Sequence, residues 1–529
     1  MFGPELTASA QGTAAAHPCT VDQGLPNDGE KALSKEDYDA ALTFYRDTVA
    51  KTPDSQDARL GLVRALIGKD QTSEATREAA EGLTKYPQSS LAKVAAGEAA
   101  FRNADFTAAL DLATAAVKLD SCDARAMDLL AEQYDLSAYF ATSARLISLA
   151  HRLRPNDELI RRDWIFSLPR KQRAEELNKY LEGPTSISKQ AQEGLQASQD
   201  HLNSHKAGEC RITSTSDTMK IPFVALHGED AFTFVGFGLD VGFNGKVRHL
   251  QIDTGASGIT LSYEAAKRLG LTPEVKLHTG GVGDDGATSS YLTHIATIQI
   301  GGIQLSDCEI EVLQKAKWDA RLDVDGLIGL DVFNRWLATL NYPDRVLTLN
   351  PLPPRPGDPA RGTAGTAVQD DDDTPRDAIV PDSMKSWTHI VRIGHQIMLP
   401  SKLNGGPLHY VIMDTGSFES LLSLAYAKET GKAKIAEEMQ ITGISGNVKK
   451  VYGVDHATLQ FGPVQLPPEF YYSIDLSRFS HNSGVEVSGF AGLPTLSRLT
   501  ITVDFRDNLM LMKYDPNHDP IKYLQTPRQ

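Results

Sequence analysis

The sequence lacks several features that would place it in a familiar class. None of its apolar runs approaches the 18 residues that a membrane-spanning helix needs, so we expect no membrane span. The formal net charge is −15, and a general nucleic-acid binder needs lysine and arginine clustered on one face. The catalytic signatures HExxH, GxSxG and GxxxxGKS/T are also missing. We therefore expect neither nucleic-acid binding nor the chemistry that these motifs carry out.

Cysteine is scarce. Cys19, Cys122, Cys210 and Cys308 lie far apart and show no CxxC spacing, so neither a zinc site nor a dense disulfide framework is indicated. The cysteine pattern does not decide between a reducing and an oxidising compartment. Four consecutive aspartates, 370–373, have no spaced ligands around them, and we interpret them as a solvated charge run. The sequence therefore predicts no metal and no cofactor.

The chain is long enough for several domains. It has 529 residues, and domains cluster at about 100 to 200 residues, so about three units are expected. Residues 1–30 begin with small residues that resemble the cleavage end of a secretory signal, but the basic and apolar regions of a signal are missing in front. A disordered tail and a signal remnant both remain open. We expect a periplasmic or secreted protein.

Residues 31–205 are predicted to form a helical repeat. The segment is rich in alanine, leucine and glutamate, and Pro53, Pro87 and Pro155 fall on a 34-residue grid. Small residues keep fixed distances from this grid: Ala41, Ala75, Ala109, Ser143, Ala58, Ala92 and Ala126. The pattern resembles the tetratricopeptide repeat, although the usual tryptophan of that family is missing. A non-repeating helical bundle is the alternative. A repeat array would offer a concave face to a protein partner or a substrate segment.

Two β-rich copies follow, at 212–350 and 379–520. Their texture changes to short alternating apolar runs, which indicates strands. Each copy holds the same tripeptide, in LQIDTGASGITLS at 250–262 and in YVIMDTGSFESLLS at 410–423. An Asn-Gly turn precedes each acid by nine or ten residues, which predicts a hairpin whose second strand ends at the acid. Between the copies, residues 351–378 have the composition of an extended, solvent-exposed linker.

The duplication continues beyond the acids. DGLIGLDVF at 325–333 matches SGFAGLPTL at 488–496 in the same order. Two equivalent loops can meet on a pseudo-twofold axis, as identical surfaces do in an isologous dimer. Asp253 and Asp414 would then face each other, and two carboxylates about 3 Å apart share one proton because both cannot ionise cheaply. The ionised carboxylate can deprotonate an attacking water while its partner hydrogen-bonds to the developing oxyanion.

Both copies resemble aspartic proteases of the retropepsin-like form common in bacteria, joined in tandem like the two lobes of pepsin. The resemblance implies a monomer with two all-β lobes that form an intramolecular pseudo-dimer. It implies an aspartic endopeptidase that acts on peptides or proteins, with Asp253 and Asp414 as the catalytic pair. The residues that would support the two loops are Thr254, Gly255, Thr415, Gly416, Ser417, Gly329 and Gly492. The glycines expected in flaps over the substrate are Gly280, Gly281, Gly283, Gly443 and Gly446.

Two positions depart from the pepsin pattern. Ala256 stands where the second copy has Ser417, so the first acid should have one hydroxyl donor fewer. Fewer donors to the ionised form raise the pKa of a carboxyl group, and we expect an optimum nearer neutral than strongly acidic. The flap tyrosine of pepsin has only Tyr291 and Tyr452 as candidates.

Two other functions remain open. Actin-like and sugar-kinase ATPases also carry an acid, a small residue and glycine twice per chain, but they need larger α/β lobes. The second alternative is a catalytically inactive scaffold whose protease-like lobes only bind peptides. A single acid could simply form a turn, but this does not explain the matched surroundings of both.

Overall fold

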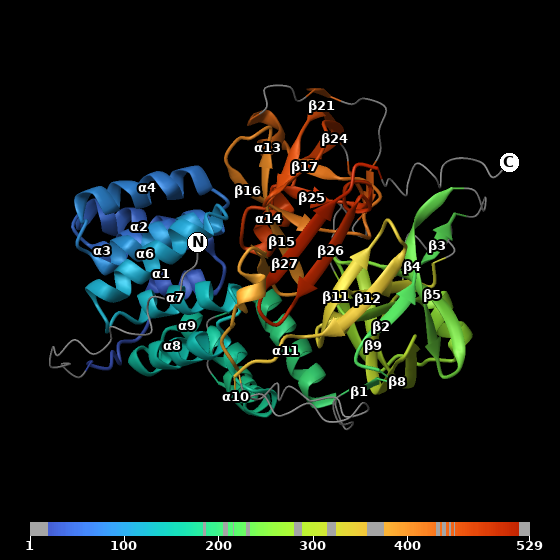
Figure 1. The fold of residues 1–529 in the computed structure, drawn as a ribbon. Coiled ribbons are helices and arrows are strands. Elements are labelled where there is room, and N and C mark those ends of the chain that lie inside the picture. Colours follow the sequence, from blue (N-terminus) through green and yellow to red (C-terminus); the bar gives the residue numbers. More distant parts are fainter. Residues whose placement is uncertain are drawn as a thin grey trace.

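The computed structural model consists of a helical array followed by two β lobes, and the second lobe lies between the helices and the first lobe (Figure 1). Within the residues that it describes, no helix is long and apolar enough to cross a membrane. The described residues are 19–183, 187–204, 210–214, 216–228, 233–279, 288–314, 324–356, 375–429, 434–435, 441–443, 446–448 and 450–517.

The helices of the array repeat every 34 residues, as the sequence predicts. They are α1 (Asp28–Ser34), α2 (Tyr38–Lys51), α3 (Gln56–Gly68), α4 (Thr72–Lys85), α5 (Ser90–Arg102), α6 (Phe106–Leu119), α7 (Ala124–Leu136), α8 (Phe140–Leu153), α9 (Glu158–Ser167), α10 (Arg170–Glu182) and α11 (Lys189–Ser204). The starts of α2, α4, α6 and α8 are 34 residues apart. Ala41, Ala75 and Ala109 are buried at equivalent places, where small side chains let paired helices approach closely.

The predicted tail of residues 1–30 is too long. Helix α1 begins at Asp28, and Asn27 caps it because its side chain accepts a hydrogen bond from the Glu30 amide at 2.9 Å. The segment before the cap is also fixed, since Cys19 forms a disulfide with Cys122. The tail prediction relied on composition, which carries no information about either contact.

The two lobes consist mainly of strands. The first lobe holds β1 (Arg211–Ser214), β2 (Met219–Pro222), β3 (Val224–His227), β4 (Phe234–Phe243), β5 (Lys246–Ile252), β6 (Ile259–Ser262), α12 (Tyr263–Leu269), β7 (Val275–Thr279), β8 (Thr288–Ile300), β9 (Ile303–Leu313), β10 (Gly326–Ile328), η1 (Leu330–Phe333), β11 (Trp336–Asn341) and β12 (Val346–Pro351). The second holds η2 (Asp382–Met384), β13 (Thr388–His389), β14 (Val391–Ile393), β15 (Gln396–Leu403), β16 (Leu408–Met413), β17 (Leu421–Ser423), α13 (Leu424–Glu429), β18 (Lys434–Ile435), β19 (Ile441–Gly443), β20 (Gly446–Val448), β21 (Tyr452–Ala457), β22 (Leu459–Phe461), β23 (Val464–Gln465), β24 (Glu469–Ile474), α14 (Ser477–Ser483), β25 (Gly489–Ala491), α15 (Leu493–Leu496), β26 (Leu499–Asp504) and β27 (Leu509–Tyr514). Within the described residues the helices of both lobes are short, which does not fit the ATPase alternative.

The two lobes share one arrangement around the acids. Strands β5 and β16 each end one residue before an acid. Strand β10 lies between β5 and β6, parallel to the first and antiparallel to the second. Strand β25 lies in the same way between β16 and β17. The turn predicted at Asn244 and Gly245 joins β4 to β5, and both residues have the positive φ angles that this hairpin turn requires.

Strands from both lobes form one sheet, which joins the two lobes. Its strand order is β13-β27-β26-β11-β12-β2, so β11 of the first lobe pairs with β26 of the second. The hydroxyl groups of Thr339 and Thr502 lie 2.9 Å apart in this pairing. One hydrophobic core also runs through both lobes. Opening the lobes would therefore break a strand pairing and expose apolar surface, so we infer that they form a single folding unit.

The helical array packs against the second lobe (Figure 1). The ring of Phe106 contacts that of Tyr410 with centroids 4.8 Å apart, and Asn508 donates a hydrogen bond to the Leu136 carbonyl at 2.8 Å. A hydrophobic cluster continues from these residues into the lobe. Tyr410 lies on β16, the strand that leads to Asp414. The array is therefore packed directly against a strand that carries one of the acids.

The linker is not solvent-exposed along its whole length, contrary to the prediction for residues 351–378. Asp377 accepts hydrogen bonds from the amide and the hydroxyl of Thr142 at 2.8 and 2.7 Å. The amide of Ala378 donates to the Ala138 carbonyl. The array therefore fixes the end of the linker through contacts that its composition does not indicate. The aspartates 370–373 lie outside the described residues.

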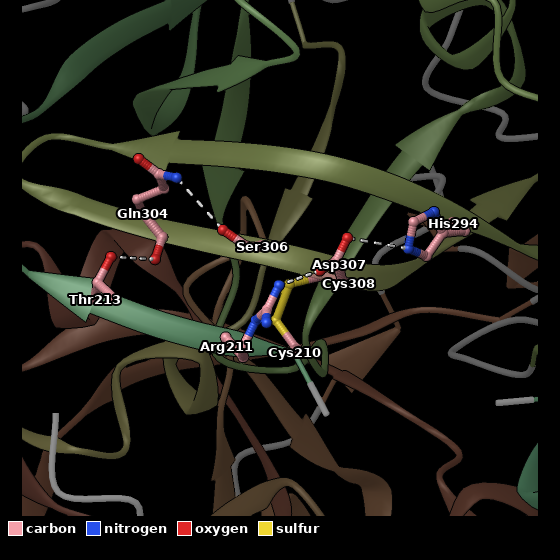
Figure 2. The surroundings of a disulfide bond; sticks show 8 residues. All are labelled: Cys210, Arg211, Thr213, His294, Gln304, Ser306, Asp307 and Cys308. Atoms are coloured by element: carbon pink, nitrogen blue, oxygen red, sulfur yellow. Dashed lines mark hydrogen bonds and ion pairs between the residues drawn. A yellow bond between two sulfur atoms is a disulfide. The ribbon is translucent and has the colours of Figure 1, made fainter. Parts of the chain in front are cut away.

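Two disulfides join cysteines that are distant in sequence. Cys210 bonds to Cys308, and Figure 2 shows the surrounding contacts, including the ion pair between Arg211 and Asp307. This bond fixes β1 to β9, which pair as antiparallel strands. The sequence separations are 98 and 103 residues, so spacing along the chain did not indicate either pair.

Removing the second disulfide should destabilise the first lobe. We expect the Cys210→Ser/Cys308→Ser variant to lose about 2 to 4 kcal/mol of unfolding free energy, because the unfolded chain gains freedom. Urea unfolding followed by fluorescence measures this change. A Cys19→Ser/Cys122→Ser variant is the matched control and should affect the array instead. Equal midpoints for the parent and the first variant would contradict the expectation.

Candidate active site

The two acids meet at the interface between the lobes. The amide of Asp253 donates to the Ile328 carbonyl at 3.0 Å, and that of Asp414 donates to the Ala491 carbonyl at 2.9 Å. These bonds fix each acid to the short strand beside it. The two carboxyl groups lie close enough for each to change the pKa of the other. Asp253 is only 8% exposed.

The glycines after the acids let the two turns approach closely. A Cβ atom on Gly416 would lie 2.4 Å from the carboxyl carbon of Asp253. A Cβ atom on Gly255 would lie 3.1 Å from that of Asp414. Each carboxyl group therefore packs against the glycine of the opposite lobe. Glycine at both positions is explained by this contact rather than by a turn alone.

The threonines brace the two turns across the interface. The hydroxyl of Thr254 donates to the Met413 carbonyl at 2.7 Å, and that of Thr415 donates to the Ile252 carbonyl at 2.8 Å. Each hydroxyl also accepts from the amide of the opposite threonine, at 3.0 and 3.1 Å. All of these groups are buried. The four bonds form a symmetric network directly behind the carboxyl groups.

The neighbouring glycine loops lie where the duplication places them. Gly329 donates to the Gly258 carbonyl at 2.7 Å, and Gly492 donates to the Ser420 hydroxyl at 3.0 Å. A side chain at Gly329 would meet backbone of the first turn, and one at Gly492 would meet Glu419. Both loops therefore pack against the segments that follow the acids.

The hydroxyl of Ser417 is not a donor to Asp414, contrary to the sequence-based expectation. It donates to the Glu419 carbonyl at 2.7 Å, whereas its backbone amide donates to Asp414 at 3.0 Å. Backbone amides thus supply the hydrogen bonds on both sides, including one from Gly255 to Asp253 at 2.8 Å. The difference between Ala256 and Ser417 consequently does not make the two acids unequal.

Burial raises the pKa of both acids, and Asp414 is affected more. Desolvation, followed by the negative charge of Asp253, raises the pKa of Asp414 well above its ordinary value. Desolvation also raises the pKa of Asp253, but the Gly255 amide, the Asp414 hydrogen bond and the positive field of His395 oppose this rise. The pair therefore favours a proton on Asp414 and a negative charge on Asp253.

The raised pKa of Asp414 makes the fold less stable as the pH rises. The folded protein keeps this proton above about pH 4, where an unfolded aspartate loses it, so stability falls as the pH increases. We expect Asp414→Asn to raise the melting temperature at pH 7 by about 1 to 3 °C and to change it little at pH 4. Calorimetry at the two pH values measures this difference. A variant that melts below the parent at pH 7 would contradict the argument.

The predicted flaps are described only in part. Gly443 and Gly446 pair with each other in the hairpin of β19 and β20. Gly280, Gly281 and Gly283 lie outside the described residues. Tyr291 is 2% exposed and belongs to the hydrophobic core, so it does not fit the role of a flap tyrosine. Tyr452 starts β21, where it pairs with Ser473.

Three residues around the turns were missed from the sequence. His395 lies 3.0 Å from the Gly255 carbonyl through its Nε2 atom, and Gln251 donates to the Gly416 carbonyl at 3.4 Å. Asp331 accepts hydrogen bonds from the Ser257 hydroxyl and the Gly258 amide at 2.7 and 2.9 Å. The second copy has proline at the position of Asp331, so a comparison of the two copies does not mark Asp331 as a site residue.

Comparisons with known proteins give two family matches. Residues 239–332 match the model described as aspartyl protease, and residues 32–97 match the tetratricopeptide repeat model. No curated protein matched the chain. Similar solved structures include a thermophilic TPR protein of Thermus thermophilus with 16% identity, which covers 31% of this chain and 90% of its own at a TM-score of 0.25. The aspartic proteinase from Irpex lacteus has 12% identity and covers 56% of this chain and 98% of its own at a TM-score of 0.33. The family matches confirm the predicted resemblance to the tetratricopeptide repeat over residues 32–97 and to aspartyl proteases over residues 239–332.

Proposed function

We propose that the protein is an aspartic endopeptidase that hydrolyses peptide bonds with a water molecule activated between Asp253 and Asp414. One observation carries the proposal: two carboxyl groups, one from each lobe, each pack against the glycine of the opposite turn above a symmetric threonine network. Acid-base chemistry of this kind needs one proton donor and one proton acceptor on opposite sides of the reacting water. The aspartyl protease match over residues 239–332 supports the same activity.

The favoured charge state assigns a role to each acid. Asp253, which carries the negative charge, takes a proton from the water as its oxygen attacks the peptide carbonyl carbon. Asp414 donates its proton to the carbonyl oxygen, which gives a neutral tetrahedral diol. Asp253 then returns its proton to the leaving nitrogen as the carbon–nitrogen bond breaks, and Asp414 recovers a proton from the diol. The cycle ends with a free amine, a carboxylic acid and the original charge state.

A cleavage assay tests this function. The protein is incubated with denatured casein and with a mixed peptide library between about pH 3 and pH 8, and new termini are identified by mass spectrometry. The double variant Asp253→Asn/Asp414→Asn is the control. We expect cleavage by the parent and none by the variant. Peptides that bind but stay intact would favour the inactive scaffold, and cleavage by the double variant would contradict the proposed site.

We further propose that the helical array binds a segment of the substrate or of a protein partner. A cavity of about 340 Å³ lies against α1, α2 and α3, and its lining mixes charged with apolar and aromatic side chains, among them Glu30, Asp57, Arg125, Phe44, Tyr45 and Leu60. Arg125 is paired with Glu30 and Asp57, so these charges balance one another. Such walls suit a peptide segment that carries both polar and apolar side chains. Cross-linking of library peptides to the inactive double variant, with mapping by mass spectrometry, tests this proposal. Cross-links that avoid α1 to α3 would contradict it.

We also propose that the protein acts as a monomer in an oxidising compartment, as a periplasmic or secreted protein does. The joined lobes place both acids in one chain, and two disulfides are typical of proteins outside the reducing cytosol. Sedimentation and thiol labelling of the native protein test both parts. A stable dimer would contradict the first, and free thiols would contradict the second.

A further inference from the structure

The two turns that carry the acids are each held by a side chain from the opposite lobe. Gln251 of the first lobe donates its amide to the Gly416 carbonyl, and His395 of the second lobe contacts the Gly255 carbonyl. The two side chains do not occupy equivalent places in the duplication, since Gln251 lies on β5 and His395 lies between β14 and β15. The contacts are therefore similar in geometry but different in chemistry.

The position of His395 is set by a tight turn. Gly394 and His395 form the two-residue connection between β14 and β15, which is closed by the pair Ile393 and Gln396. Gly394 has a φ of +60°, a left-handed conformation that glycine adopts without strain. Because a carbonyl oxygen only accepts hydrogen bonds, the Nε2 atom of His395, 3.0 Å from the Gly255 oxygen, carries the hydrogen.

His395 differs from Gln251 because it can carry a charge. A protonated imidazole favours the ionised form of a nearby carboxyl group, and His395 lowers the pKa of Asp253 in this way. The other charged groups on the same two strands are Arg392 and Lys402. The guanidinium of Arg392 interacts with carboxylates of other elements: Asp135, Asp331 and Asp504. The amide of Gln251 is neutral at every pH. The environment of the two acids is therefore unequal on the side of Asp253.

We propose that His395 is a positioning residue of this site, which holds the Gly255 carbonyl, and with it the turn after Asp253, from across the lobe interface. The inference rests on the proposed peptidase function, because the position of this turn matters to the reaction only if Asp253 takes part in it. It adds an imidazole to a site otherwise made of carboxyl, hydroxyl and amide groups. His395 is exposed, so solvent and salt reduce its effect on Asp253.

Two substitutions separate the hydrogen bond from the charge. His395→Gln keeps a donor near the Nε2 position and removes the charge, whereas His395→Ala removes both. His456→Gln is the matched control, because His456 belongs to the same lobe and its side chain is 81% exposed. Activity of the three variants is measured as kcat and kcat/KM against pH with one quenched peptide substrate, and melting temperatures show whether each variant folds.

The expected results differ in kind. In His395→Gln kcat should stay within about twofold of the parent, because a donor to the Gly255 carbonyl remains. His395→Ala should lose roughly tenfold in kcat, since the turn is no longer held. His456→Gln should match the parent. A loss in His395→Gln as large as that in His395→Ala, or no loss in His395→Ala, would overturn the proposal.

A readout without activity tests the same contact. Hydrogen exchange of the peptide that spans residues 250–262 is followed by mass spectrometry in the parent and in the His395 variants. His395→Ala should exchange faster there, and His395→Gln should match the parent, because only the first variant lacks a donor to the Gly255 carbonyl. Equal exchange in the parent and His395→Ala would overturn the inference. The expected difference in a protein that cleaves nothing would support the contact and reject the peptidase function.

Discussion

Replacing either Asp253 or Asp414 by asparagine is expected to lower kcat for peptide hydrolysis by roughly 10³-fold or more. The reaction needs one carboxylate that accepts a proton and one carboxylic acid that donates it, and an amide does neither. Because the remaining acid has no partner of the right kind, the double variant should be hardly worse than either single variant. Initial rates with a quenched peptide measure the loss, and the melting temperature of each variant shows that the fold is kept.

Mixing the two single variants tests whether the pair forms within one chain. Strands β11 and β26 and a shared core join the lobes, so an intact lobe of one molecule should not pair with that of another. Activity should therefore stay at the level of the single variants. Recovery of activity on mixing would show that lobes pair between molecules. A single variant that keeps more than about a tenth of the parent rate would contradict the assignment of both acids.

Gly416→Ala is expected to lower kcat by about 100-fold, and Gly255→Ala by clearly less. The new Cβ atom at position 416 would lie 2.4 Å from the carboxyl carbon of Asp253, so this buried and hydrogen-bonded group must move. At position 255 the closest approach is 3.1 Å, which a small adjustment can absorb. A displacement of about 1 Å in a catalytic group is enough for a loss of this size.

A glycine without neighbours is the control for this pair. Gly194 lies in α11 with no atom near its added Cβ position, so Gly194→Ala should leave kcat unchanged. Rates and melting temperatures of the three variants are compared at one pH. Equal losses at positions 255 and 416, or no loss at 416, would contradict the close approach of the two turns.

The sequence predicts those parts of the molecule that depend on local repetition. The 34-residue grid predicts the starts of the paired helices, and the Asn-Gly turn at 244–245 predicts a hairpin that leads to Asp253. These features follow from residues close together in the chain. The meeting of Asp253 and Asp414 was expected because the two copies match in order, which makes a symmetric arrangement reasonable.

Contacts between distant segments could not be predicted in this way. The bond of Cys210 to Cys308 and the binding of Asp377 by Thr142 join positions with no common pattern. The hydroxyl of Ser417 also donates to a backbone carbonyl and not to the neighbouring acid. Residue type alone does not predict this partner, because local backbone geometry decides it. His395 was missed for a related reason, since a single histidine in a Gly-His turn gives no sign of what it faces.

The contact of Phe106 with Tyr410 limits how far this protein can be shortened. A fragment cut after the last helix would keep every residue of the two acid-bearing turns. It would also expose a hydrophobic surface on the second lobe, because Met398, Tyr410 and Ile412 are buried together with residues of the helices. Such a fragment would aggregate through this surface. Strand β16, which leads to Asp414, would also lose the packing of the helices against it. The smallest stable form of the protein therefore includes the helices.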